Sequence, residues 1–385
     1  MSNFQTLDRL LQSFVDNGLP GCTLHVTQHG ETIYEGFFGM ANRETGEKIT
    51  DRSIFRMASM SKLPLYTTMM ILYERGEFLL SDPISRFLPE WESSRKYVRL
   101  PNGYVTTVPT SRPINISDTL SMKCGLPYCN SYGPTDNLTL RAMQKAMQPL
   151  VAKGHFTNRE QVAAISTVPL ACEPGERWIY GFSSELAAAI IEAVCGKGID
   201  DVFQELLFDP LEMPSTRSRF FGDTQQRMVQ LYRRESDRTL TPVNLPIDEK
   251  HLPGEEHEEG WARLFSTGSD YSHLMTMLAC GGVYKGRRIL GRKTIDMMRA
   301  NGLPNGLEGS YFAGYGYGYG VRTLMTHAEG SNGSLGAFGW SGGFGTWCES
   351  DPSEELAVVY MHNMVPCEEE YYHLRVRSAV YGCLE

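Results

Sequence analysis

The chain has 385 residues, of which 41% are hydrophobic and 21% are charged, and its formal net charge is −9. This composition is that of an ordinary globular protein and excludes a disordered, collagenous or coiled-coil chain. The acidic balance argues against nucleic acid as a partner, because non-specific affinity for phosphates comes from Lys and Arg.

The first residues of the chain predict an amphipathic helix, since apolar side chains recur at helical spacing among polar ones over 4–15. They lack the basic start and the continuous apolar core of a signal peptide. No apolar run reaches the length that spans a bilayer. We therefore expect a cytoplasmic protein with no membrane partner.

The next elements are two strands and a long helix. Residues 22–28 and 32–39 predict the strands, and His29-Gly30 between them predicts a hairpin turn. The apolar-rich stretch 60–74 predicts the helix, which ends at Gly76.

The middle of the chain predicts helices and the end predicts strands. Further helices are expected in these ranges: 138–153, 184–195, 200–208, 269–280, 292–301 and 374–381. From Gly314 onward the sequence predicts strands, while residues 215–260 are polar and predict irregular structure. Strands at both ends of the chain, with helices between, predict one sheet built from the two termini.

One tetrad predicts a catalytic serine. Ser59-Met60-Ser61-Lys62 is an S-x-x-K sequence at the start of the long helix, and residues three apart on a helix share a face. Lys62 can therefore remove the proton from the Ser59 hydroxyl, which makes the oxygen a nucleophile. The alternative is a serine that caps the helix while its lysine reaches solvent.

The text around this tetrad, 53–62 (SIFRMASMSK), resembles the nucleophile segment of the serine β-lactamase and penicillin-binding-protein superfamily. Further segments resemble the family in the same order along the chain: 80–91 (LSDPISRFLPEW), 114–127 (INISDTLSMKCGLP) and 173–180 (EPGERWIY). The chain is most similar to the class C β-lactamase-related esterases, called family VIII carboxylesterases.

The resemblance implies a second catalytic group, Tyr180, whose phenol serves as a base or proton shuttle. In class C β-lactamases an Asn that binds the substrate amide stands where this chain has Phe182. Phe cannot make that hydrogen bond, so this difference favours an ester with an apolar acyl group. The alternative for Tyr180 is a buried ring with a satisfied hydroxyl.

Trp340-Ser341-Gly342-Gly343 matches the family's substrate-binding edge strand, where Lys or His, Thr or Ser, and Gly are usual. Trp340 replaces a cation that would bind a substrate carboxylate, and it offers an aromatic wall instead. By position, the N–H groups of Gly343 and Ser59 form the oxyanion hole. The alternative is a buried Trp on a glycine-rich strand.

The same segment also satisfies G-x-S-x-G, the nucleophile elbow of α/β-hydrolases, with Ser341 as nucleophile. That elbow requires a helix after the serine, whereas 344–348 reads as extended. We therefore disfavour Ser341 as the nucleophile.

The remaining polar and sulfur-containing residues predict no metal site. His251 and His257 flank an acidic run, which we expect to be a solvated loop. The nine cysteines are odd in number and show no C-x-x-C spacing, so we expect reduced, buried thiols.

The fold that the resemblance implies is α/β (α+β), the β-lactamase/transpeptidase-like arrangement of an antiparallel sheet flanked by helices plus a mainly helical region. We expect a discontinuous α/β domain from 1–80 and 251–385, carrying Ser59 and the 340–343 strand. The mainly helical region, 81–250, carries Tyr180.

The implied function is hydrolysis of carboxylic esters with short to medium acyl chains through an acyl-Ser59 intermediate, with no cofactor. The expected partner is a small-molecule ester or lactam substrate. Three alternatives keep the same site: a β-lactamase, a D-amino-acid peptidase and an acyltransferase. A fourth is a non-catalytic, penicillin-recognising binding or sensor protein. The sequence leaves the oligomeric state open.

Overall fold

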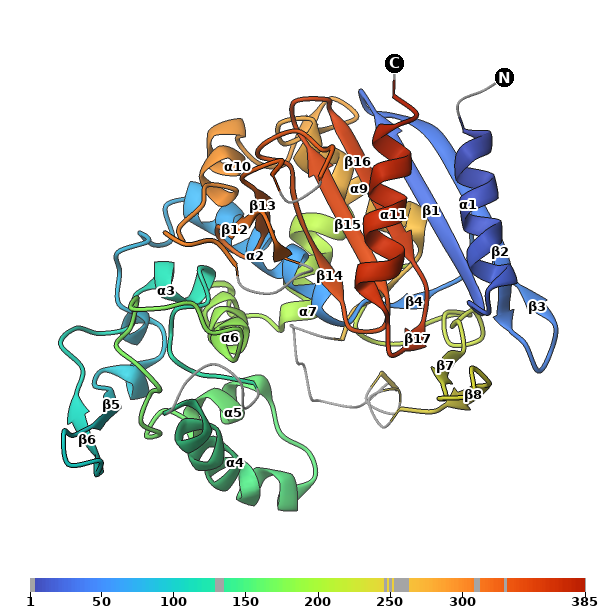
Figure 1. Ribbon diagram of the computed structural model, residues 1–385. Helices are drawn as coiled ribbons and strands as arrows, with labels where there is room; N and C mark the ends of the chain where they lie inside the picture. The colour runs from blue at the N-terminus through green and yellow to red at the C-terminus, as the bar shows by residue number, and fades with distance from the viewer. Residues whose placement is uncertain are drawn as a thin grey trace. The chain divides into compact units, whose positions relative to one another are not determined.

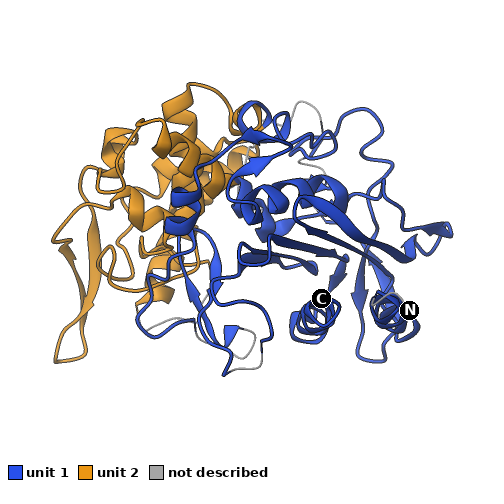
Figure 2. Ribbon diagram, turned by 90° about the horizontal axis from the view of Figure 1, so that it is seen from above, with its two compact units in different colours: residues 1–64, 204–253, 262–385 blue, residues 65–203, 254–261 orange. Residues whose placement is uncertain are grey.

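A computed structural model describes residues 4–128, 135–245, 248, 251–252, 263–307, 312–328 and 331–384. The chain forms two compact units (Figure 2). Unit 1 comprises residues 1–64, 204–253 and 262–385, and unit 2 comprises residues 65–203 and 254–261.

Unit 1 is built on an eight-stranded sheet in which every neighbouring pair is antiparallel (Figure 1). In pairing order its strands are β12 (Tyr315–Tyr317), β13 (Arg322–Leu324), β14 (Phe338–Gly342), β15 (Thr346–Asp351), β16 (Leu356–Met361), β1 (Gly21–Gln28), β2 (Glu31–Asn42) and β3 (Glu47–Lys48). Strands β1 and β16 are neighbours inside the sheet, so the two ends of the chain share one sheet, as predicted.

The hairpin between β1 and β2 has the predicted two-residue turn. Gln28 pairs with Glu31, and His29 and Gly30 have φ angles of 53° and 82°. Two positive φ angles in succession are typical of a type I′ turn, whose twist matches that of the flanking strands.

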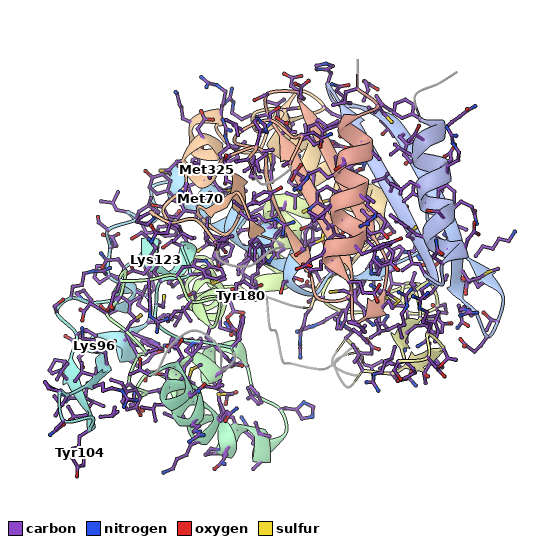
Figure 3. The ribbon with its side chains drawn as sticks, viewed as in Figure 1. Met70, Lys96, Tyr104, Lys123, Tyr180 and Met325 are labelled. Carbon is purple, nitrogen blue, oxygen red and sulfur yellow. The ribbon has the colours of Figure 1, made fainter. Side chains whose placement is uncertain are left out.

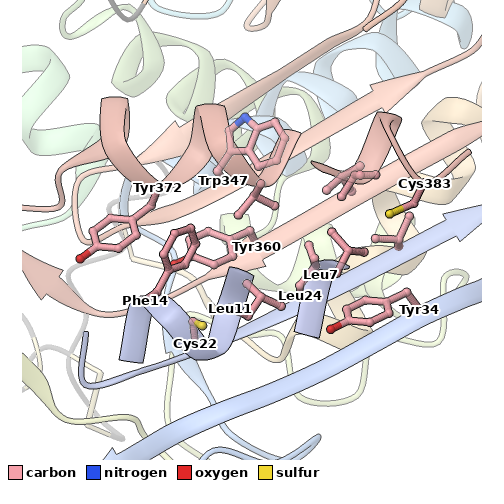
Figure 4. Packing of buried hydrophobic residues seen from close by; sticks show 14 of the residues in the cluster. Leu7, Leu11, Phe14, Cys22, Leu24, Tyr34, Trp347, Tyr360, Tyr372 and Cys383 are labelled. Carbon is pink, nitrogen blue, oxygen red and sulfur yellow. The ribbon is translucent and has the colours of Figure 1, made fainter. Parts of the chain in front are cut away.

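Helices cover both faces of the sheet. Helices α1 (Gln5–Asp16) and α11 (Glu369–Tyr381) lie side by side on one face (Figure 1). Between them and the sheet lies a core of apolar side chains from α1, β1, β15, β16 and α11 (Figure 4). Helix α9 (Gly268–Ala279) covers the opposite face, where Thr27 Oγ1 of β1 lies 2.6 Å from Thr276 Oγ1 of α9.

The alternation of β1 explains this layering. Its apolar residues Cys22, Leu24 and Val26 belong to the core beneath α1 and α11. Its polar residues alternate with them, and they are also buried because α9 lies over them. At Gly268, the first residue of α9, a Cβ atom would lie 2.3 Å from the His25 ring. The glycine therefore lets the helix approach the sheet.

The other elements of unit 1 are short. They are β4 (Phe55–Arg56), paired with β9 (Phe265–Ser266); β7 (Leu231–Arg234), paired with β8 (Leu240–Val243) and β17 (Met364–Val365); β10 (Val283–Tyr284), paired with β11 (Arg287–Arg288); and α10 (Arg292–Met298), η1 (Ala58–Ser61) and the π-helical turn η4 (Gln204–Phe208).

Unit 2 is mainly helical and carries one hairpin. Helix α2 (Lys62–Glu74) begins in unit 1 and continues into unit 2. The others are η2 (Ile84–Arg86), η3 (Pro89–Trp91), α3 (Ile116–Leu120), α4 (Asp136–Lys153), α5 (Asn158–Ala164), α6 (Ser183–Cys195) and α7 (Ile199–Phe203), with the hairpin of β5 (Arg95–Arg99) and β6 (Val105–Pro109). Among the described residues, no helix is long and apolar enough to cross a bilayer.

The units divide the chain at residues other than those predicted. The region predicted as 81–250 differs from unit 2 at both ends. Helix α2 beyond Pro64 belongs to unit 2, where Tyr66 Oη lies 3.2 Å from Ser184 Oγ. Residues 204–253 belong to unit 1, in which β7 pairs in parallel with β17.

The antiparallel sheet with its flanking helices confirms the predicted fold class.

Candidate active site

Ser59 lies in a tight turn rather than in the first turn of the α-helix. It belongs to the 3-10 segment η1, which leads directly into α2. The preceding residue, Ala58, has a φ angle of 46°. This left-handed conformation costs a residue with a Cβ atom roughly 1–2 kcal/mol. Such strain is concentrated at functional sites, where the surrounding structure enforces it.

Hydrogen bonds from distant parts of unit 1 hold this turn in place. Tyr271 Oη of α9 donates to the Met60 carbonyl at 2.7 Å. The Leu264 N–H donates to Ser61 Oγ at 3.1 Å, and the Met57 N–H donates to the Leu264 carbonyl at 3.0 Å. The turn that presents Ser59 is therefore fixed on both sides of the serine.

The structure brings Ser59 and Lys62 together, as the spacing predicts. Lys62 Nζ donates to Ser59 Oγ at 3.3 Å. The Lys62 side chain is fully buried, whereas Ser59 is partly exposed. The alternative of a lysine that extends into solvent is therefore wrong. The arrangement places an amine against the hydroxyl of a partly exposed serine, as general-base activation of a nucleophile requires.

The end of β14 lies against the same turn. A Cβ atom on Gly342 would lie 2.2 Å from the Met57 carbonyl oxygen, and Thr346 Oγ1 donates to that oxygen at 3.2 Å. Gly343 follows as the first residue of the turn between β14 and β15; it is exposed, and a Cβ there would meet open space. Glycine at 342 therefore permits close packing, and Gly343 has open space beside it.

Ser341 is a strand residue and not a nucleophile elbow. It pairs with Trp347 of β15, and a turn and a second strand follow it where the elbow needs a helix. The residue is 6% exposed, and Ser341 Oγ donates to Glu369 Oε2 at 3.1 Å. The structure thus rules out the elbow geometry for the G-x-S-x-G sequence.

Trp340 is the centre of a cluster of aromatic rings and one cation. Its ring is 4% exposed, stacks on Phe312 at 5.9 Å and meets Tyr317 edge-on at 5.4 Å. The Arg322 guanidinium lies 5.8 Å from the Trp340 ring centroid. Of the two stacked rings, Trp340 is buried and Phe312 is partly exposed. The aromatic surface that is accessible here therefore belongs to Phe312.

Tyr180 lies in unit 2, on the loop before α6 (Figure 3). Gly181 forms an antiparallel bridge with Pro127, and a Cβ on Gly181 would lie 1.8 Å from the Leu126 carbonyl oxygen. The Tyr180 ring stacks on Trp178 at 5.9 Å and is partly exposed. The loop is therefore pinned to segment 126–128, and the Tyr180 side chain is supported by a neighbouring ring.

Tyr128 organises the neighbourhood of Tyr180 within unit 2. Its ring meets Tyr180 edge-on at 5.6 Å and lies 5.0 Å from Phe182. Its hydroxyl donates to the two carboxylate oxygens of Glu185 at 3.1 and 2.9 Å, and Glu185 is fully buried. Burial raises the pKa of Tyr128 well above its usual value, so this phenol stays protonated.

Two buried histidines lie beneath the β14–β15 turn. His373 Nε2 lies 3.1 Å from the Gly345 carbonyl oxygen, and His362 Nδ1 lies 3.1 Å from Tyr360 Oη. Burial lowers the pKa of His362 to about 3 and that of His373 well below its usual value. Both rings are therefore neutral packing elements at neutral pH.

The expectation of a solvated loop is wrong for His251, which is buried. Its Nδ1 atom lies 2.6 Å from the Ser218 carbonyl oxygen, and its ring packs on Phe220 and Phe265. His257 lies outside the described residues. Within the described ranges, no group of His, Cys, Asp and Glu is arranged to hold a metal ion.

The cysteines of the described part of the chain are free thiols, and most of them are buried. Burial raises the pKa of Cys22, Cys348 and Cys367 to about 12. These thiols are protonated and therefore unreactive at neutral pH. Cys129 lies outside the described residues.

Sequence reasoning missed two groups beside the predicted residues, Glu369 and Tyr128. Tyr128 directly follows the family-like segment 114–127, so its position was a usable signal. Glu369 gives no such local signal. It is 28 residues from Ser341, and an acidic residue in the first turn of a helix is ordinary.

Known proteins resemble this chain along most of its length. Residues 7–380 match the beta-lactamase family. Esterase EstB of Burkholderia gladioli is 25% identical over 372 residues, covering 91% of this chain and 88% of EstB.

Solved structures share the fold at lower identity. EstCE1, described as a hydrolase with promiscuous acyltransferase activity, has a TM-score of 0.80 at 23% identity, covering 98% of both chains. Simvastatin synthase (LovD) of Aspergillus terreus has a TM-score of 0.82 at 18% identity, covering 99% of this chain and 98% of LovD. The chain therefore belongs to the beta-lactamase family and has the fold of the serine β-lactamases and penicillin-binding proteins.

Proposed function

We propose that this protein is a serine esterase that cleaves carboxylic esters, with short to medium acyl chains, through an acyl-Ser59 intermediate. The observation that carries the proposal is the distance of 3.3 Å between the amine of the buried Lys62 and the hydroxyl of Ser59, a partly exposed residue. The likeness to esterase EstB along most of both chains supports an ester as the substrate.

The proposed reaction has two halves. Lys62 takes the proton of Ser59 as Ser59 Oγ bonds to the ester carbonyl carbon, and the carbonyl electron pair moves to oxygen. The N–H groups of Ser59 and Gly343 receive this oxyanion. The C–O bond to the alcohol then breaks, and the alcohol takes a proton that we assign to Tyr180. In the second half, water bonds to the acyl carbon and gives a proton to Tyr180, the bond from that carbon to Ser59 Oγ breaks, and Ser59 Oγ takes back the proton held by Lys62, which releases the acid.

Two substitutions relative to the wider family argue for an ester rather than a β-lactam or a D-peptide. Phe182 offers a ring where an amide-binding Asn is usual, and Trp340 stands where a carboxylate-binding cation is usual. The Phe182 ring cannot make the hydrogen bonds of the Asn amide, and Trp340 carries no charge to pair with a carboxylate. An unpaired polar group on a bound substrate costs affinity.

Acyl transfer to an alcohol is the second candidate. It uses the same acyl-Ser59, with an acceptor alcohol in place of water. EstCE1, whose fold this chain shares, is described as having acyltransferase activity. Adding a primary alcohol during ester turnover distinguishes hydrolysis from acyl transfer. A transferase forms the ester of the added alcohol in proportion to the alcohol concentration.

The test is intact-protein mass spectrometry after brief exposure to p-nitrophenyl butyrate, followed by peptide mapping. We expect one butyryl group on Ser59, and no label or turnover in Ser59→Ala. The matched variant is Ser341→Ala, in which we expect the label to remain on Ser59. A label on Ser341 would overturn the nucleophile assignment, and the absence of any label with esters or a fluorophosphonate would favour a non-catalytic binding protein.

A further inference from the structure

Glu369 is a carboxylate that the proposed reaction does not use. It is the first residue of α11, and its Oε2 atom accepts a hydrogen bond of 3.1 Å from Ser341 of β14. Ser341 precedes Gly343 by two residues, so their Cα atoms lie at most about 7 Å apart. The carboxylate is therefore fixed beside the strand that is proposed to bind the substrate.

The Glu369 carboxylate makes no direct ion pair within the described part of the chain, and a cation that acts on it, Arg322, does so at longer range. Among the described residues, no lysine, arginine or histidine forms an ion pair with it within 4.0 Å. Its second oxygen, Oε1, receives the Cys367 thiol at 3.6 Å. Arg322 lowers the pKa of Glu369 from a distance, although burial has the larger, opposing effect. The guanidinium of Arg322 lies over the rings of Phe312, Tyr315 and Trp340.

An open cavity adjoins this carboxylate. The described residues that line it are Phe312, Glu368, Glu369, Glu370 and Tyr371. Phe312 connects the cavity to the site because its ring stacks on Trp340. A group that enters here meets aromatic surface and negative charge, and the lining contains no basic side chain among the residues described.

We propose that Glu369 determines the charge selectivity of this esterase by rejecting esters whose leaving group carries an anion. Ser341 positions the carboxylate beside the strand that is proposed to bind the substrate, and repulsion between like charges disfavours binding of the anionic ester. Neutral esters meet no such penalty. The inference rests on the proposed ester hydrolysis and assigns to it a substrate class.

The experiment compares two phenyl butyrates that differ in one charge: the 4-methylsulfonyl ester, which is neutral, and the 4-sulfonate ester, which is anionic at every pH used. The measured quantity is the ratio of kcat/KM for the neutral ester to that for the anionic ester. We expect this ratio to fall about tenfold in Glu369→Gln. The matched control is Glu47→Gln, which removes one exposed carboxylate from β3 of the same unit and should leave the ratio at the wild-type value.

A second measurement needs no variant. Burial raises the pKa of Glu369 above that of an ordinary glutamate, so lowering the pH from 8 to 4 protonates this carboxylate, while the sulfonate stays charged. We expect the wild-type ratio to fall with pH, and a constant ratio overturns the inference even if Glu369→Gln does not fold. Equal ratios in wild type and Glu369→Gln also overturn it, while ester hydrolysis itself stands. Failure of the wild-type protein to hydrolyse either ester overturns the proposed function instead.

Discussion

Lys62 Nζ lies 3.3 Å from Ser59 Oγ, at the point where a 3-10 turn becomes the helix α2. The two residues are three apart, and the transition between helix types keeps them on one face. Lys62 is fully buried, while Ser59 is partly exposed. This asymmetry suits a base that must accept a proton without reaching the substrate itself.

The first prediction concerns this amine. Lys62→Met removes the base, and Lys62→Arg replaces it with a guanidinium that stays protonated in proteins. Both variants are expected to lower kcat for p-nitrophenyl butyrate by about 10²–10⁴-fold. Stopped-flow measurement of p-nitrophenol release should show a slower acylation phase. Lys48→Met, at an exposed position on β3, is the control and should keep the wild-type rate. Full activity in Lys62→Arg would show that charge, and not proton transfer, is the role of Lys62.

The second prediction separates Tyr180 from its neighbour Tyr128. Tyr180→Phe is expected to lower kcat by about 10²-fold or more, because the proposed proton donor to the alcohol is lost. Tyr128→Phe keeps the ring that packs on Tyr180 but removes a hydrogen bond to the buried Glu185. Its expected effect is on stability, a loss of about 1–3 kcal/mol in the free energy of unfolding.

Urea unfolding and ester kinetics on the two variants test this assignment. The expected pattern is a large loss of kcat with little loss of stability for Tyr180→Phe, and the reverse for Tyr128→Phe. The opposite pattern would identify Tyr128 as the proton-transfer residue.

The elements with strong local signals are those that the sequence predicts well. The β1–β2 hairpin has a Gly in a two-residue turn, and helix α6 combines helix-forming residues with Gly196 in the left-handed conformation at its end. The S-x-x-K spacing is likewise local, which is why Ser59 and Lys62 could be paired before the fold was known. The family-like segments then implied the fold type, an antiparallel sheet flanked by helices with a mainly helical region.

Long-range contacts account for what the sequence did not predict. Strands β7 and β8 lie in a polar stretch, and the parallel pairing of β7 with β17 joins residues more than 100 positions apart. His251 stands in a polar run, yet Phe220 and Phe265 bury it. The hydrogen bond from Ser341 to Glu369 likewise depends on where α11 packs, which no local pattern encodes.

The third prediction uses two glycines of the β14–β15 turn. Gly345 has a φ angle of 105°, and a Cβ there would lie 1.9 Å from His362 Nε2. Gly345→Ala must therefore displace a buried ring as well as strain the backbone, and we expect a loss of several kcal/mol in the free energy of unfolding. Gly343→Ala is the matched control. A Cβ at this position meets open space, so the expected change in melting temperature is small. Equal destabilisation by the two variants, measured by thermal unfolding, would contradict the packing described for His362.

The fourth prediction is that the protein loses stability in mild acid. Burial lowers the pKa of His251 to about 4, that of His362 to about 3 and that of His373 well below its usual value. In the unfolded chain each histidine binds a proton near pH 6.5, so below that pH the unfolded state holds more protons than the folded state. The free energy of unfolding therefore falls as the pH falls from 6.5 toward 4. At pH 5 the expected loss is about 2 kcal/mol for each histidine relative to pH 8.

Urea unfolding at several values of pH between 8 and 5 measures this loss, and His251→Gln isolates one histidine. The Gln amide can still donate to the Ser218 carbonyl, which His251 Nδ1 contacts at 2.6 Å, but it binds no proton in this range. The stability of the variant should therefore fall less steeply with pH than that of the wild type. Buried carboxyls such as Glu349, whose pKa burial raises, act in the opposite direction in both proteins and cancel from the comparison. Parallel pH profiles for the two proteins would show that His251 is protonated without unfolding, and that its burial does not control acid stability.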